Sequence, residues 1–309
     1  MRNISFYRDF TGYTGGHQKV RDYLEHSLLY QKLCCDLYLT STCDDSNIFA
    51  NCEGVNYQQE YRPDQSDFVF LAGLDWKAYL PYFDPLQTKI NLIQHLRHAD
   101  PAHEQFYYLQ YYAIRICVSE SVRGAIEPYA NGPCVHVPMG HHLPEIITDG
   151  KKVDIYILAK KRPGVGVKIA EWAEKKGLTF ILHDELQTKN TVLQAMASAS
   201  LSVLLPHKTE GFYLPGIEAA YYSERVLMTN CIANFEYADV SSNITICNYP
   251  LADIFSALEK FYAETNVKNA FDKNIRSKEK STIKQRYSLE HERIQYQKIL
   301  TNLIEGEGK

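Results

Sequence analysis

HKTEGFYLPGIEAA, residues 207–220, is the stretch that decides the fold of this chain. It follows a short apolar run at residues 201–205, which predicts a buried strand. Gly211 and Gly216 suit a tight loop, and residues 217–222 continue as a helix. The stretch therefore predicts a strand, a loop and a helix, the unit from which α/β domains are built.

Two carboxylates flank the loop. Backbone N–H groups at a loop and helix start are unpaired, so they favour an anion such as a diphosphate. Glu210 lies before this anion site and Glu218 about two turns beyond it. In a fully helical segment, eight residues at ~1.5 Å each would separate the carboxylates by roughly 12 Å. This spacing suits binding the two ends of an elongated ligand, and it exceeds the roughly 5–9.5 Å of a glycosidase acid/base pair.

A family resemblance rests on the pattern PHKTEGFYLPGIEA at residues 206–219. It resembles the E-x7-E signature of retaining, nucleotide-sugar-dependent glycosyltransferases of the GT-B fold, in the group 1 (family four) class. A second reading stays open, because the helix dipole favours a glutamate at a helix start and a glutamate within a helix is ordinarily solvated.

The resemblance implies a role for each residue of the motif. Glu218 would hold the ribose hydroxyls of the donor nucleotide, and Glu210 the hydroxyls of the transferred sugar. The backbone of the Gly211 loop, through the amides of Phe212, Tyr213 and Leu214, would stabilise the negative charge growing on the leaving diphosphate.

A basic turn follows the predicted strand at residues 153–159. Lys160, Lys161 and Arg162 suit a diphosphate, and the resemblance assigns Lys160 and Arg162 to the donor phosphates without deciding which of the three cations makes contact. A solvated basic turn is the alternative. His207 stands where the family usually has a small residue, and it either adds a phosphate contact or narrows the pocket.

The chain begins with a second strand, loop and helix. A strand at residues 4–7, the paired glycines Gly15 and Gly16, and a helix from residue 17 to 30 form the opening unit of a Rossmann-like domain. The glycines do not fit the G-x-G-x-x-G fingerprint of dinucleotide sites. They resemble the paired-glycine loop of the same glycosyltransferases, which lies near donor phosphate and acceptor, although Gln18 stands where the family often has Glu.

Histidines add two further candidates. His95 follows the strand predicted at residues 89–94 and resembles the family's strand-end histidine facing the interdomain cleft. By that resemblance it would hydrogen-bond the sugar near its reacting carbon, and a purely structural role is the alternative. His141 and His142 lack a carboxylate or Cys at supporting spacing, so no metal is expected.

The composition excludes several classes of protein. A net charge of −4 and a pI near 6.3 give no basic footprint for nucleic acid. No apolar run approaches a membrane span, and the N-terminus lacks the apolar core of a signal peptide. Eight cysteines without a C-x-x-C pair predict free thiols. We expect a cytoplasmic protein with at most peripheral contact at the inner face of a membrane.

The expected fold is α/β, with two facing Rossmann-like domains (GT-B) and an interdomain cleft. A length of 309 residues allows two domains, 1–149 on the acceptor side and 150–275 for the nucleotide-sugar donor, with a hydrophilic linker at 147–152. The strongly helical pattern from residue 275 to 304 predicts a C-terminal helical segment, 276–309, that returns to pack on the first domain.

The expected function is a metal-independent retaining glycosyltransferase. Its partners would be a nucleotide-sugar and a glycan or lipid-linked acceptor, with no bound cofactor and no nucleic acid. A nucleotide-sugar-binding pseudoenzyme or assembly subunit, or a nucleotide-sugar epimerase on the same fold, would show the same pattern. An NAD-dependent dehydrogenase is disfavoured by the missing fingerprint.

Overall fold

The computed structural model describes residues 1–44, 46–147, 150, 153–265 and 273–306. It divides into two compact units, of which the first contains Met1–Gly140 and the chain from Leu289 onward, and the second His141–Ser288. The division falls between Gly140 and His141, whereas the sequence predicted a domain boundary after residue 149. Within the expected linker, residues 148, 149, 151 and 152 lie outside the described residues.

The first unit contains a seven-stranded parallel sheet in the order β3-β2-β1-β4-β5-β6-β7. The chain winds outward in both directions from the neighbouring strands β1 and β4, as in a doubly wound Rossmann-like domain. Its strands are β1 (Arg2–Arg8), β2 (Leu33–Leu39), β3 (Val55–Gln58), β4 (Phe68–Ala72), β5 (Thr88–Ile93), β6 (Ile114–Cys117) and β7 (Cys134–His136). Its helices are α1 (Gly15–Leu28), α2 (Asp75–Tyr79), α3 (Glu120–Ile126), α10 (Leu289–Gly306) and the 3₁₀ turns η1 (Pro63–Gln65), η2 (Leu80–Tyr82), η3 (Leu96–Ala99) and η4 (Glu104–Gln110).

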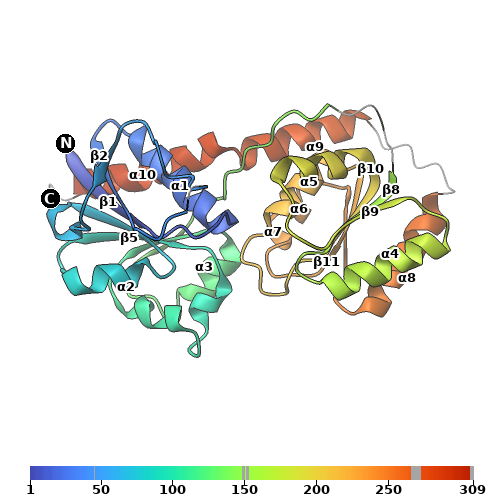
Figure 1. The fold of residues 1–309 in the computed structure, drawn as a ribbon, viewed down its shortest axis with the longest axis horizontal. Coiled ribbons are helices and arrows are strands. Elements are labelled where there is room, and N and C mark those ends of the chain that lie inside the picture. Colours follow the sequence, from blue (N-terminus) through green and yellow to red (C-terminus); the bar gives the residue numbers. More distant parts are fainter. Residues whose placement is uncertain (45, 148–149, 151–152, 266–272, 307–309) are drawn as a thin grey trace. The chain divides into compact units, whose positions relative to one another are not determined.

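Strand β4 shows why both faces of this sheet are covered. Its sequence, FVFLA, is apolar throughout, which is typical of a central strand of a parallel sheet. Phe70 faces Tyr23 of α1 and Tyr296 of α10, while Val69 packs with Trp76 of α2 on the other side. Figure 1 shows α1 and α10 on one face and α2 and α3 on the other.

The second unit contains a five-stranded parallel sheet in the order β12-β11-β10-β8-β9. Strand β8 pairs with both β9 and β10, so the winding reverses between β8 and β10. Its strands are β8 (Val153–Leu158), β9 (Phe180–His183), β10 (Ala199–Leu204), β11 (Arg225–Thr229) and β12 (Ile244–Cys247). Its helices are α4 (Pro163–Lys175), α5 (Lys189–Ser198), α6 (Leu214–Tyr222), α7 (Phe235–Ala238), α8 (Leu251–Thr265) and α9 (Lys273–Arg286).

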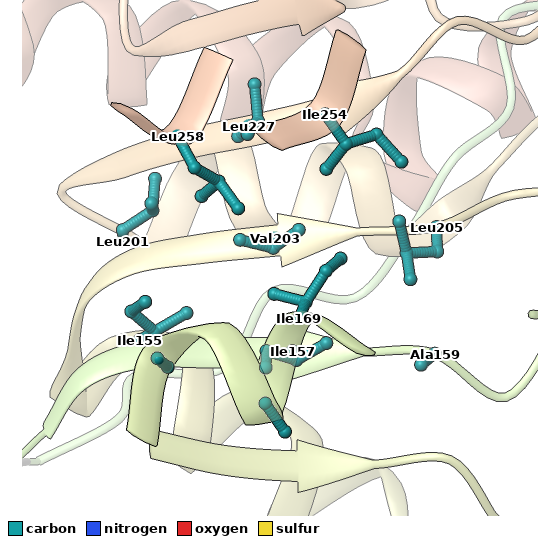
Figure 2. Close-up of a cluster of buried hydrophobic side chains, with 12 residues drawn as sticks. Ile155, Ile157, Ala159, Ile169, Leu201, Val203, Leu205, Leu227, Ile254 and Leu258 are labelled. Atoms are coloured by element: carbon teal, nitrogen blue, oxygen red, sulfur yellow. The ribbon is translucent and has the colours of Figure 1, made fainter. Parts of the chain in front are cut away.

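Apolar side chains from alternate strand positions form the core of the second unit (Figure 2). Ile155 and Ile157 of β8 and Val203 of β10 point to the face covered by α4 and α8. Ile169 from α4 and Ile254 from α8 complete this layer, and all five side chains are at most 1% exposed. Helices α5 and α6 cover the opposite face (Figure 1).

The expected C-terminal helix is two helices. Tyr287 and Ser288 interrupt it, and the Tyr287 carbonyl accepts a hydrogen bond of 2.7 Å from the amide of His141. Helix α9 packs against α6 in the second unit, and α10 packs against α1 in the first. Only the part from Leu289, rather than from residue 276, therefore belongs to the first unit.

Three local features complete the first unit. Residues 73–85 contain α2, because Trp76 is buried at 1% exposure and holds a short helix against the sheet. Residues 104–110 form the 3₁₀ segment η4. The edge strand β3 pairs with β2.

Candidate functional site

The candidate site of the second unit lies where the winding of its sheet reverses. The carboxyl ends of β8 and β10 are neighbours there, and the Leu205 amide donates to the Leu158 carbonyl at 3.1 Å. The loops that follow the two strands consequently meet, and ligands of open α/β sheets bind at such a position. Lys161 Nζ from one loop lies 3.2 Å from Glu210 Oε1 of the other.

The loop after β10 turns tightly into helix α6. The Glu210 amide donates to the His207 carbonyl at 3.3 Å, and α6 begins at Leu214 without a side-chain cap. Within the described residues, the amides of Phe212, Tyr213 and Leu214 donate no hydrogen bond. Unpaired amides at the start of a helix attract negative charge, so this end of α6 is suited to an anion.

Buried aromatic rings hold this loop in place. The Tyr213 carbonyl accepts from the Gly216 amide at 2.8 Å and from the Tyr237 hydroxyl at 3.4 Å. The Phe212 ring centroid lies 5.8 Å from that of Tyr237 and 6.0 Å from that of Tyr287. A Cβ added to Gly216 would come within 2.2 Å of the Tyr237 hydroxyl, so only glycine fits there. The backbone near Glu210 is thereby preorganised.

Glu218, in the second turn of α6, is 6% exposed and has a buried partner. Its Oε1 lies 2.7 Å from Nε2 of His141, whose own amide is bonded to Tyr287. Of the two histidines considered for a metal, His141 is therefore part of a His–Glu pair. Among the described residues, no three His, Cys, Asp or Glu side chains gather as a set of metal ligands.

Tyrosines surround this pair. Burial, followed by the charge of Glu218, raises the pKa of Tyr156, whose hydroxyl lies 3.0 Å from His183 Nδ1. The Tyr222 hydroxyl donates to the Pro144 carbonyl. Glu218 therefore lies in a buried environment next to aromatic side chains, where its hydrogen bond to His141 is strengthened.

The three cations of the basic turn have different environments. Lys160 is exposed and forms no ion pair within the described part of the chain, whereas Lys161 pairs with Glu210. The guanidinium of Arg162 lies 3.7 Å from the Tyr249 ring centroid, and Nη2 donates to the Tyr249 carbonyl at 3.0 Å. Arg162 Nη1 is buried and has no hydrogen-bond partner among the described residues. Lys208 Nζ lies 4.9 Å from the centroid of the same Tyr249 ring.

In the loop between β10 and α6, the two predicted residues Gly211 and His207 differ in exposure. Gly211 is buried, as expected for a loop backbone that packs on the domain. His207 is exposed at the surface of the turn. The structure thus brings Glu210, Lys161 and the start of α6 together.

The predicted residues of the first unit also lie near one another. Gly15 and Gly16 open α1 after β1, with Thr14 Oγ1 capping the helix by accepting from the His17 amide at 3.2 Å. The Gly16 carbonyl accepts from Gln94 Nε2 at 3.3 Å, and Gln94 directly precedes His95. The glycine loop and the end of β5 are therefore joined at the carboxyl edge of the sheet.

The imidazole of His95 has a defined tautomer. Its Nδ1 accepts from the Arg97 amide at 3.1 Å at the start of η3. A neutral imidazole that accepts at Nδ1 carries its proton at Nε2, so Nε2 is a hydrogen-bond donor.

Three residues next to the candidate site residues were not predicted from the sequence as parts of a donor or acceptor site: His141, Gln94 and Tyr249. His141 is far from Glu218 in the sequence, and no spacing rule links them. Tyr249 follows β12 and belongs to a loop without motif. Gln94 lies next to the predicted His95, and its position at a strand end was the one available signal.

No helix of the described residues combines the length and apolar character needed to cross a bilayer. No protein-family model and no curated protein sequence matches this chain.

Solved structures resemble the whole chain. Sucrose-phosphate synthase of Thermosynechococcus elongatus has a TM-score of 0.69 at 12% identity, with 99% of this chain and 100% of that chain covered. The HepE protein of Anabaena in complex with UDP-glucose has a TM-score of 0.66 at 11% identity, with 98% and 100% covered. A glycosyltransferase of Rickettsia africae has a TM-score of 0.68 at 11% identity, with 98% of both chains covered.

These similarities show the fold. The chain has two Rossmann-like domains of the GT-B glycosyltransferase fold, which confirms the fold class expected from the sequence.

Proposed function

We propose that this protein is a glycosyltransferase that moves a sugar from a nucleotide-sugar to a hydroxyl of a glycan, lipid-linked or other acceptor. In the reaction, the acceptor oxygen forms a bond to the anomeric carbon of the sugar as the bond from that carbon to the diphosphate oxygen breaks. The departing diphosphate takes the acceptor proton. No side chain of the protein needs to act as nucleophile.

The observation that carries the proposal is the ion pair of Lys161 and Glu210, 3.2 Å apart beside the uncapped start of α6. A cation and unpaired amides are suited to the phosphates, and a neighbouring carboxylate is suited to sugar hydroxyls. A nucleotide-sugar presents both groups next to each other. Fold likeness adds support, because HepE was solved in complex with UDP-glucose.

In this proposal Glu210 binds hydroxyls of the transferred sugar and Glu218 those of the ribose. The amides of Phe212, Tyr213 and Leu214 stabilise the charge on the leaving diphosphate, and preorganised donors of this kind are typically worth about 3–4 kcal/mol each.

Around that centre, the positive charges of Arg162 and Lys161 attract the phosphates. Lys160 attracts them more weakly, because its charge is solvated. Gly211 lets the loop approach the ligand, and His207 borders the phosphate side of the pocket.

For the first unit we propose that Gly15 and Gly16 lie near phosphate and acceptor. His95 would donate from Nε2 to the sugar near its reacting carbon. Transfer with retention, independence from metal ions and membership of the group 1 (family four) class are further parts of the proposal, as is a cytoplasmic location with at most peripheral membrane contact.

The first test is a binding and turnover panel on the purified chain. UDP-glucose, other UDP-sugars, and GDP-, ADP- and dTDP-sugars are compared in thermal shift and slow hydrolysis, with NAD as a control. We expect one nucleotide-sugar both to stabilise the protein and to be hydrolysed slowly. Stabilisation without hydrolysis or transfer would favour the pseudoenzyme, release of a rearranged sugar would favour an epimerase, and no response to any donor would contradict the proposal.

The second test replaces the central carboxylate. Glu210→Gln keeps the side-chain size and removes the charge that binds the sugar in the transition state. We expect transfer to fall by at least ~10²-fold while donor affinity changes little. Unimpaired transfer would remove the role proposed for Glu210.

A further inference from the structure

The buried pair of His141 and Glu218 has an arrangement that the proposed roles do not explain. His141 is 9% exposed and Glu218 6% exposed, and Nε2 of the imidazole lies 2.7 Å from Oε1 of the carboxylate. An ionised carboxylate only accepts hydrogen bonds, so the imidazole donates through Nε2–H. The bond is charge-assisted and lies in a low-dielectric environment, which makes it one of the stronger contacts of the unit.

The two carboxylate oxygens of Glu218 are unequal. Oε1 is held by His141, whereas Oε2 accepts no hydrogen bond from the described residues and is not sealed from solvent. Each carboxylate oxygen accepts in two directions, so the fixed group still offers Oε2 and the remaining direction of Oε1. This geometry matches two neighbouring hydroxyls, such as a vicinal diol.

No other side chain replaces His141 in this role. The Tyr156 hydroxyl is bonded to His183, and the Tyr222 hydroxyl to the Pro144 carbonyl. Among the described residues, His141 is therefore the one hydrogen-bond donor that orients the Glu218 carboxylate. Without it the carboxylate is free to rotate, and a ligand would have to order it on binding.

We propose that His141 is a positioning residue for nucleotide recognition: it holds the Glu218 carboxylate so that this group binds the ribose diol of a nucleoside diphosphate. This inference rests on the proposed function and adds a residue outside the E-x7-E motif to the donor site. His141 itself contacts the carboxylate and not the ligand.

The test measures ribose recognition as a ratio. Isothermal titration gives Kd for UDP and for 2′-deoxy-UDP with the parent protein, and ADP and GDP with their 2′-deoxy forms are titrated alongside. Loss of one hydrogen bond to a charged acceptor predicts about tenfold weaker binding of the deoxy form. Because both affinities are measured on one sample, a lower folded fraction cancels from their ratio.

Three variants are compared with the parent. His141→Phe keeps a ring of similar size and removes the donor, whereas His141→Gln places an amide N–H near the position of Nε2. His142→Phe, at the exposed neighbouring histidine, is the matched control. We expect His141→Phe to weaken UDP binding about tenfold with little change for 2′-deoxy-UDP, so that the ratio falls below about threefold. His141→Gln should restore part of the ratio, and His142→Phe should keep the parental value.

The outcomes separate two kinds of failure. If His141→Phe weakens both ligands equally and the ratio stays near ten, His141 is merely structural and this inference is overturned while the proposed function stands. If the parent binds several nucleoside diphosphates without any preference for ribose over deoxyribose, the inference is likewise overturned. If the parent binds none of them, the proposed function fails and the inference fails with it.

Discussion

Lys161 Nζ lies 3.2 Å from Glu210 Oε1 and thereby joins the loop after β8 to the loop after β10. Lys161 is 44% exposed and Glu210 only 13%, so the cation reaches inward from the rim to a more enclosed carboxylate. The pair orients Glu210 and places an ammonium group beside the loop that leads into α6.

This relationship predicts unequal roles for two adjacent lysines. Lys161→Met should lower kcat/KM for donor hydrolysis or transfer about tenfold, because it removes the partner of Glu210 and a charge near the phosphates. Lys160→Met, at an exposed residue of the same turn, is the control and should change kcat/KM less than threefold. Raising the ionic strength should narrow the difference, since salt screens exposed charges. Equal losses in the two variants would contradict the pairing.

Arg162 and Tyr249 predict a coupled effect on stability. The guanidinium lies 3.7 Å from the ring centroid and also donates to the Tyr249 carbonyl. Arg162→Lys loses the planar stacking, and we expect about 1–2 kcal/mol lower stability, a decrease of several degrees in Tm. Tyr249→Leu should cost a similar amount.

Thermal melting of both single variants and the double variant tests this coupling. The double variant should lose less stability than the sum of the two single losses, because each substitution removes the same contact between Arg162 and Tyr249. Strictly additive losses would show that the stacking contributes nothing.

Gly216 and Gly164 form a matched pair, since each follows a proline in the first turn of its helix. A Cβ on Gly216 would lie 2.2 Å from the Tyr237 hydroxyl, whereas a Cβ on Gly164 would meet no atom within 4 Å. Gly216→Ala should destabilise the protein by about 1–3 kcal/mol through overpacking. Gly164→Ala should be neutral or stabilise it by up to about 1 kcal/mol. Urea unfolding measures both, and a harmless Gly216→Ala would show that Tyr237 moves aside freely.

Glu292 predicts a pH-dependent contribution to stability in the first unit. It is 1% exposed, and Oε2 lies 2.6 Å from Lys19 Nζ and 3.1 Å from His26 Nε2. Burial by itself raises the pKa of Glu292, but the charge of Lys19 and the hydrogen bond with His26 outweigh burial, and the pKa lies below its ordinary value of 4.5. The stabilisation is therefore complete above pH 4.5 and is lost as the pH falls through the folded-state pKa.

Glu292→Gln tests this sign. At pH 7 it should lower the free energy of unfolding by about 3 kcal/mol, because it leaves the buried Lys19 with Asp22 as its charged partner and the Gly140 carbonyl as a neutral acceptor. The difference from the parent should shrink as the pH is lowered below 4.5. Glu290→Gln, at a side chain that is 72% exposed in the same helix, should stay within about 0.5 kcal/mol of the parent. A loss that does not change with pH would contradict the assignment.

Local patterns were sufficient for most of the fold. The apolar strand β10 and the glycine- and proline-containing loop before α6 follow from short-range rules. Helix α1 was also expected, but from residue 17, whereas it begins at Gly15. The ends of the C-terminal helices could not be predicted from local patterns, because the helical pattern of the sequence continues through Tyr287. In the structure the Tyr287 ring packs on Phe212 and its carbonyl accepts a hydrogen bond from His141, and the helix is interrupted there.

The sequence by itself determined which residue types lie at the carboxyl ends of the strands. Parallel strands end at one edge of a sheet, so a chain that alternates strands and helices must collect Glu210 and the basic turn of Lys160 to Arg162 at that edge. Periodicity and turn residues encode this much because they act over a few neighbouring positions.

Only the tertiary structure decided which side chains meet. It selected Lys161 as the partner of Glu210, placed Arg162 on Tyr249, and joined His141 to Glu218. These contacts depend on the strand order and on the rotamers that packing allows. For residues far apart in the chain, no local sequence pattern indicates the strand order or the rotamers. Distances of 3–4 Å between such residues therefore follow from the folded structure alone.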